Sequence, residues 1–148
     1  KKFDVTEFFD YLNERTGTYV LCFDIVGLMR INDDISREAG DKVILESLKR
    51  INAAAGKDMP VLRIGGDEFV MVTGLDDVEK VTKIAKAVME KNGVQTAYKG
   101  GTVPVSIRSG AVMIRKPLKY SMLCHDFDEV ISFARNDGEV HFAKAEQK

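Results

Sequence analysis

The most informative segment of this sequence is Arg63-Ile64-Gly65-Gly66-Asp67-Glu68-Phe69. It places the break Gly65-Gly66-Asp67 between two apolar runs, Val61–Ile64 and Glu68–Val72. Because glycine accepts the positive φ angles that tight turns need, this break predicts a β-hairpin with two acids at its tip. Glycine and aspartate are common turn residues, so the break taken alone indicates a turn and no particular chemistry.

Upstream of this hairpin the pattern predicts a helix, a strand and a longer helix. Apolar side chains on one side indicate a helix at Thr6–Glu14, and the apolar run Thr18–Ile25 (TYVLCFDI) indicates a buried strand. Apolar residues at helical spacing predict a helix over Gly40–Ala55, with Gly56 placed to end it.

Downstream of the hairpin the clearest helix begins at Asp76, which we expect to cap it, and ends at Gly93. The remaining elements predicted are strands at Val94–Tyr98 and Val103–Ile114 around Gly100-Gly101, a helix at Ser121–Asn136 and a strand at Val140–Phe142. Helices interleaved with a hairpin-containing sheet predict an α+β fold. We expect a ferredoxin-like or palm-like sandwich, in which helices pack on a central, mostly antiparallel sheet.

The length of 148 residues fits one domain, 1–148, with a helical lead-in at 1–18. Because the chain begins at Lys1 rather than Met, we expect a domain excised from a longer protein with an upstream sensor or regulatory domain. Basic and acidic residues total 22 and 23, a net charge of −1 that argues against a nucleic-acid partner. Apolar runs are far shorter than the ~20 residues that span a bilayer, so no membrane contact by this domain is expected.

Three acidic side chains are candidates for chemistry. Asp24 ends one predicted strand, and Asp67 and Glu68 stand at the hairpin tip. If these strands are neighbours, three carboxylates meet at one edge of the sheet and repel one another. A divalent cation would remove that conflict, and Mg²⁺ prefers such oxygen ligands together with substrate phosphates.

The chain resembles the GGDEF family of diguanylate cyclases. Gly65–Phe69 spells GGDEF, and Asp24–Asp33 (DIVGLMRIND) is similar to the family's D-I-D-x-F-K-x-I-N-D stretch. Gly40-Asp41 falls at the family's G-D pair, and Phe127–Val140 resembles its A-D-x-A-L-Y-x-A-K-x-x-G-R-N ending. The resemblance runs from about Tyr19 to the C-terminus.

The resemblance implies a set of metal and catalytic residues. Asp24 and Asp67 would bind Mg²⁺, or Mn²⁺, through their side chains, and Ile25 through its backbone carbonyl. Asp67 would also accept the proton of the attacking hydroxyl, and Glu68 would support the second metal ion.

The resemblance also implies where GTP binds. Asn32 and Asp41 would read the guanine edge, since an amide both donates and accepts while a carboxylate accepts from guanine N–H groups. The residues it places near the phosphates are Leu28, Gly65, Gly66 and Arg135. The implied reaction joins two GTP into cyclic di-GMP and releases two pyrophosphates. Because each domain holds one GTP, a homodimer is implied, in the cytoplasm even where the parent protein is anchored in a membrane.

Some residues depart from the family pattern. Met29 stands where the family has a lysine near the phosphates, and Glu139 where it has an arginine. Losing a cation and gaining an anion there weakens electrostatic stabilisation of a phosphoryl transition state. The family's product-inhibition motif R-x-x-D is absent, since the corresponding stretch is Gly56-Lys57-Asp58-Met59. Feedback binding of cyclic di-GMP is therefore not expected.

Three functions stay open at this point. The first is a Mg²⁺-dependent diguanylate cyclase. The second is a weakened domain that binds GTP or a partner protein as a signalling module and has lost turnover. The third, a related palm-type nucleotidyl cyclase or polymerase fragment, is disfavoured because no basic stripe is available for a primer.

Overall fold

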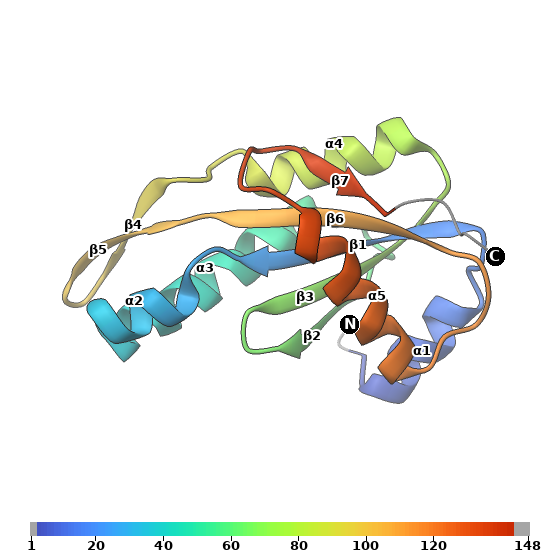
Figure 1. The fold of residues 1–148 in the computed structure, drawn as a ribbon, viewed down its shortest axis with the longest axis horizontal. Coiled ribbons are helices and arrows are strands. Elements are labelled where there is room, and N and C mark those ends of the chain that lie inside the picture. The colour runs from blue at the N-terminus through green and yellow to red at the C-terminus, as the bar shows by residue number, and fades with distance from the viewer. Residues whose placement is uncertain (1–2, 144–148) are drawn as a thin grey trace.

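A five-stranded sheet in the order β2-β3-β1-β6-β7 forms the centre of the computed structural model, which describes residues 3–143 (Figure 1). Its strands are β2 (Val61–Gly65), β3 (Glu68–Leu75), β1 (Thr18–Ile25), β6 (Ile107–Ile114) and β7 (Val140–Phe142). The central strand β1 runs antiparallel to β3 and β6, and only β7 is parallel to its neighbour. The outermost residues of the predicted ranges 1–148 and 1–18, namely 1–2 and 144–148, lie outside the described residues.

Helices cover both faces of this sheet. The helices are α1 (Val5–Asn13), α2 (Leu28–Asp34), α3 (Arg37–Ala54), α4 (Val78–Met89) and α5 (Tyr120–Phe133). Successive side chains of β1 alternate between the faces: Leu21 and Phe23 join the core cluster under α3 and α4, whereas Val20 and Cys22 join the cluster under α1 and α5. The predicted α+β sandwich is thus confirmed.

Alternation along β1 also decides where the site forms. Asp24 follows Val20 and Cys22 at two-residue intervals, so it belongs to the face that α5 covers. On the neighbouring strand, Val70 and Val72 lie on that face, and so does Glu68 at the start of β3. The acids therefore stand at the end of an otherwise apolar layer.

The predicted run Val103–Ile114 is wrong as a single strand. It divides at Ser106 into β5 (Gly101–Val105), which pairs with β4 (Val94–Tyr98) in a separate two-stranded sheet, and β6. The division occurs because the chain changes partners there, so that Val105 faces Val94 while Ile107 faces Ile25. Figure 1 shows the β4–β5 hairpin extending away from the central sheet on the side where α2 lies.

Two helix predictions also need correction. Asp77, not Asp76, caps α4, and its carboxylate accepts hydrogen bonds from the backbone N–H groups of Glu79 and Lys80. The short helix α2 was not predicted, and it begins after Gly27, which has a φ of 71°. Within residues 3–143, no helix combines the length and the apolar composition that crossing a bilayer requires.

Candidate functional site

A row of three charged side chains crosses the three central strands near their ends, on the α5 face. Asp24 in β1 lies opposite Glu68 in β3 on one side and opposite Arg108 in β6 on the other. Asp67 stands next to this row in the hairpin turn, and its carbonyl accepts a 2.9 Å hydrogen bond from the backbone N–H of Ile25. That bond holds the hairpin tip against the end of β1.

The three carboxylates of Asp24, Asp67 and Glu68 lie together, as the sequence led us to expect. Each offers an oxygen, and these oxygens lie within 4.8 Å of one another. The grouping joins acids more than 40 positions apart in the chain, because antiparallel pairing of β1 with β3 places the start of one strand beside the end of the other.

Burial and mutual repulsion oppose ionisation of this cluster. Asp24 is only 7% exposed, and its pKa is raised chiefly by burial and further by the charge of Asp67. The pKa of Glu68 is also raised, first by burial and then by the charges of Asp67, Asp128 and Asp24. A divalent cation between the carboxylates would oppose both effects, and three hard oxygen donors suit Mg²⁺ or Mn²⁺. The donor set therefore fits the metal that the resemblance implies.

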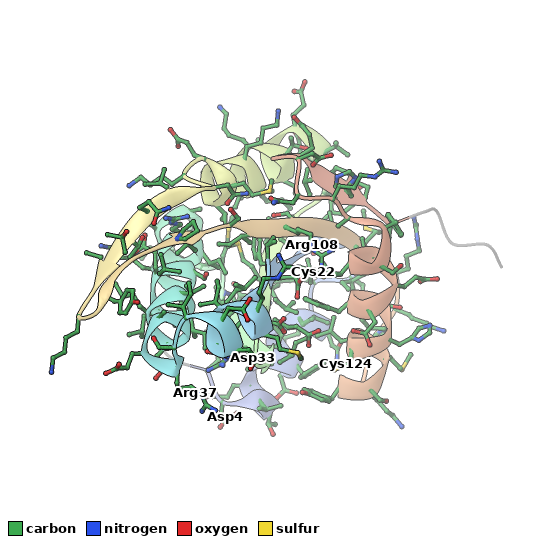
Figure 2. All side chains as sticks on the ribbon, turned by 60° about the vertical axis from the view of Figure 1, so that its left-hand side comes forward. Asp4, Cys22, Asp33, Arg37, Arg108 and Cys124 are labelled. Carbon is green, nitrogen blue, oxygen red and sulfur yellow. The ribbon has the colours of Figure 1, made fainter. Side chains whose placement is uncertain are left out.

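Arg108 is a site residue that the sequence analysis missed. Its Nη2 donates a hydrogen bond to Oδ2 of Asp24, and its Nη1 donates to the carbonyl of Ala134 at 3.3 Å. Figure 2 labels Arg108 in the region of the central strands. Arg108 is the one charged residue in the run 103–114 (VPVSIRSGAVMI), and a lone charge inside an apolar strand is the signal that could have revealed it.

The two glycines of the hairpin serve different purposes. Neither Gly65 nor Gly66 has a positive φ, so the predicted conformational reason for them is wrong. A Cβ at Gly65 would lie 2.4 Å from Oε1 of Glu68, so the absence of a side chain there leaves room for that carboxylate. A Cβ on Gly66 would meet nothing within 4 Å, so the space beside this residue is open.

The predicted guanine-reading residues lie on the helix pair α2–α3. Asn32 in α2 packs against Gly40 in α3, where a Cβ would stand only 1.7 Å from its Oδ1. That oxygen is buried and has no hydrogen-bond partner among the described residues. Asp41 follows Gly40 directly and is exposed. An amide acceptor without a partner beside an exposed carboxylate suits a ligand edge that donates N–H groups.

The predicted phosphate-binding residues are less uniform. The side chain of Leu28 is 8% exposed and belongs to the core, so only its backbone is available to a ligand. Arg135 is exposed and follows Ala134, the residue whose carbonyl Arg108 contacts. Met29 is 77% exposed and supplies no charge. Glu139 forms an ion pair with Lys86 of α4 at 3.3 Å, so its negative charge has a partner outside the acid cluster.

Comparison with known proteins identifies relatives of this chain. The family model described as "Diguanylate cyclase, GGDEF domain" matches residues 6–141. Diguanylate cyclase DosC of Escherichia coli K12 is 27% identical over 129 residues, which cover 84% of this chain but 28% of DosC. The chain thus spans less than a third of the length of that curated relative.

Solved structures share the fold. The GGDEF domain of PA1120 (YfiN or TpbB) from Pseudomonas aeruginosa superposes with a TM-score of 0.79 at 22% identity, covering 99% of both chains. The GGDEF domain of DgcB from Caulobacter crescentus, solved in complex with c-di-GMP, gives a TM-score of 0.72 at 21% identity, covering 93% of this chain and 88% of that one. With the family model matching nearly the whole chain, this protein belongs to the GGDEF domain family of diguanylate cyclases.

Proposed function

We propose that this domain binds GTP with Mg²⁺ or Mn²⁺ and, as a homodimer, condenses two GTP into cyclic di-GMP. The observation that carries the proposal is the group of three carboxylates, with oxygens within 4.8 Å of one another at the family's metal positions. The unpartnered amide oxygen of Asn32 beside Asp41 supports guanine as the base. We further propose an upstream sensor or regulatory domain, since a diguanylate cyclase of the same fold, SiaD, was solved in complex with its activator SiaC.

Each part of the site has a distinct task in this proposal. Asp24, Asp67 and Glu68 would hold the metal, which when bound would polarise the phosphates and offset charge on the departing pyrophosphate. Asn32 and Asp41 hold the base, so that the triphosphate lies across the open position at Gly66. Holding the reactants in place supplies much of the rate in phosphoryl transfer, because little covalent chemistry falls to the protein.

The reaction needs two copies of the domain facing each other. In each half-reaction the 3′-oxygen of one GTP bonds to the α-phosphorus of the other, the bond to pyrophosphate breaks, and Asp67 accepts the hydroxyl proton. Asp67 lies in the hairpin turn and not in the packed core, so a substrate on the facing domain can reach it. A two-fold symmetric dimer gives both half-reactions the same geometry.

The test is direct turnover at high protein concentration. Purified protein is incubated with GTP and Mg²⁺ or Mn²⁺, and cyclic di-GMP is measured by chromatography and mass spectrometry. Asp67→Ala serves as the control, since it removes the proposed metal ligand and proton acceptor from a half-buried position in the turn. Equal turnover in the variant would refute the role of Asp67, and absence of GTP binding by the native protein would refute the proposal as a whole.

A second candidate function is a GTP-binding signalling module without turnover. Two observations favour it. Met29, at the family's lysine position, is 77% exposed and uncharged, and Glu139, at the family's arginine position, is an acid paired with Lys86. Loss of such cations removes transition-state stabilisation more than ground-state binding. GTP binding without product, with product appearing in Met29→Lys, identifies this function.

A further inference from the structure

The acid cluster already has a cation inside it. Asp24 lies between Glu68 and Arg108 in the cross-strand row, and Arg108 contributes a positive charge directly to the Asp24 carboxylate. An arginine is always charged in proteins, so this positive charge is a permanent feature of the cluster.

Two hydrogen bonds hold Arg108 in this position. One terminal nitrogen donates to Asp24 and the other to the carbonyl of Ala134 at the end of α5. The Nε is buried without a partner among the described residues, and the side chain as a whole is 30% exposed. Solvent screens such a half-buried guanidinium less than a fully exposed one, so it interacts with Asp24 through both its charge and its hydrogen bond.

A divalent ion bound by Asp24 would meet this guanidinium at close range. Mg²⁺ lies about 2.0–2.1 Å from its ligand oxygens, while Arg108 hydrogen-bonds to the same carboxylate. Even with the ion on Oδ1 and the arginine on Oδ2, the two positive charges would stand a few ångströms apart and repel each other. Asp24 can therefore bind the ion with full strength only when the ion pair between Arg108 and Asp24 is broken.

We propose that Arg108 competes with the divalent ion for Asp24, so that the domain without nucleotide binds metal weakly until the arginine is displaced. This inference rests on the proposed function, because it concerns the same metal site. A nucleoside triphosphate would supply the displacing group, since guanidinium groups bind phosphate oxygens bidentately. Metal and nucleotide then bind together rather than in sequence.

The test uses Mn²⁺ alone, without nucleotide, on the whole domain. Its affinity is measured by calorimetry and by electron paramagnetic resonance for the native protein, Arg108→Ala, Arg108→Gln and Arg108→Lys. Arg108→Gln keeps a long polar side chain in β6 and covers the case in which the alanine variant fails to fold. Arg115→Ala is the matched control, because Arg115 is exposed and lies just beyond the opposite end of β6.

The expected result is that both neutral variants bind Mn²⁺ at least tenfold more tightly than the native protein, whereas Arg108→Lys and Arg115→Ala do not. The rise in melting temperature on adding Mn²⁺ should be larger in the neutral variants, since the metal replaces a missing counter-charge. Unchanged or weaker Mn²⁺ affinity in the neutral variants overturns the role of Arg108 and leaves the proposed function intact. Failure of native and neutral variants alike to bind Mn²⁺, even at millimolar concentrations, overturns the metal site and this inference with it.

Discussion

Gly40→Ala should separate nucleotide recognition from stability. An added Cβ would lie 1.7 Å from Oδ1 and 2.7 Å from Cγ of Asn32, both far inside contact distance. Because Ala39 and Val43 of α3 are buried in the core, we expect the side chain of Asn32 to move rather than the backbone of α3. The substitution therefore displaces the proposed guanine-reading amide without altering any acid of the metal cluster.

The magnitude follows from two opposing effects. Alanine is about 1 kcal/mol more favourable than glycine inside a helix, so the variant should be about as stable as the native domain once the displacement of Asn32 is included. The amide of Asn32 can make two hydrogen bonds to guanine, each with a net value of about 0.5–1.5 kcal/mol. Losing both weakens GTP binding by about 1–3 kcal/mol, or roughly 5- to 150-fold in Kd.

Calorimetric titration with GTP and Mg²⁺ measures this effect in a double-mutant cycle. Gly40→Ala, Asn32→Ala and the double variant should lose similar affinity, because all three remove the same amide from the base. Discrimination between GTP and ATP should fall in each of them. Native affinity in Gly40→Ala, or additive losses in the double variant, would refute the link from Gly40 through Asn32 to the base.

Three other predictions concern the hairpin and the phosphate region. In calorimetric titrations, Gly65→Ala should weaken Mn²⁺ binding about tenfold or more by displacing the Glu68 carboxylate, whereas Gly66→Ala should weaken GTP binding and leave Mn²⁺ binding unchanged. Equal effects of the two variants on Mn²⁺ affinity would contradict the proposal that Gly65 makes room for Glu68. Because the pKa of Glu68 is raised in the folded state, its contribution to stability is complete below about pH 4.3, the ordinary pKa of a glutamate, and is lost as the pH rises through the raised pKa. The metal-free native domain should therefore lose stability relative to Glu68→Gln toward neutral pH, and an equal difference between their urea midpoints at pH 4 and pH 7 would contradict this. Met29→Lys should raise cyclic di-GMP formation at least tenfold by restoring a cation near the phosphates, and an unchanged rate would mean that position 29 does not limit turnover.

The local pattern was sufficient for most of the fold. The hairpin around Gly65-Gly66-Asp67 and the buried strand Thr18–Ile25 were both predicted, because apolar runs and turn residues reflect short-range preferences. The convergence of Asp24 with Asp67 and Glu68 was expected once these strands were taken as neighbours. The family motif names the same residues.

Tertiary structure alone decided what surrounds those residues. Arg108 meets Asp24 because β6 pairs with β1 in one register, and a shift by one residue would turn the arginine to the other face. Gly65 and Gly40 are required not by their own φ angles but by side chains from another strand or helix, Glu68 and Asn32, that occupy the space of a missing Cβ. Each of these contacts joins residues of two different strands or helices. Only the packing of those strands and helices brings the residues within reach of one another.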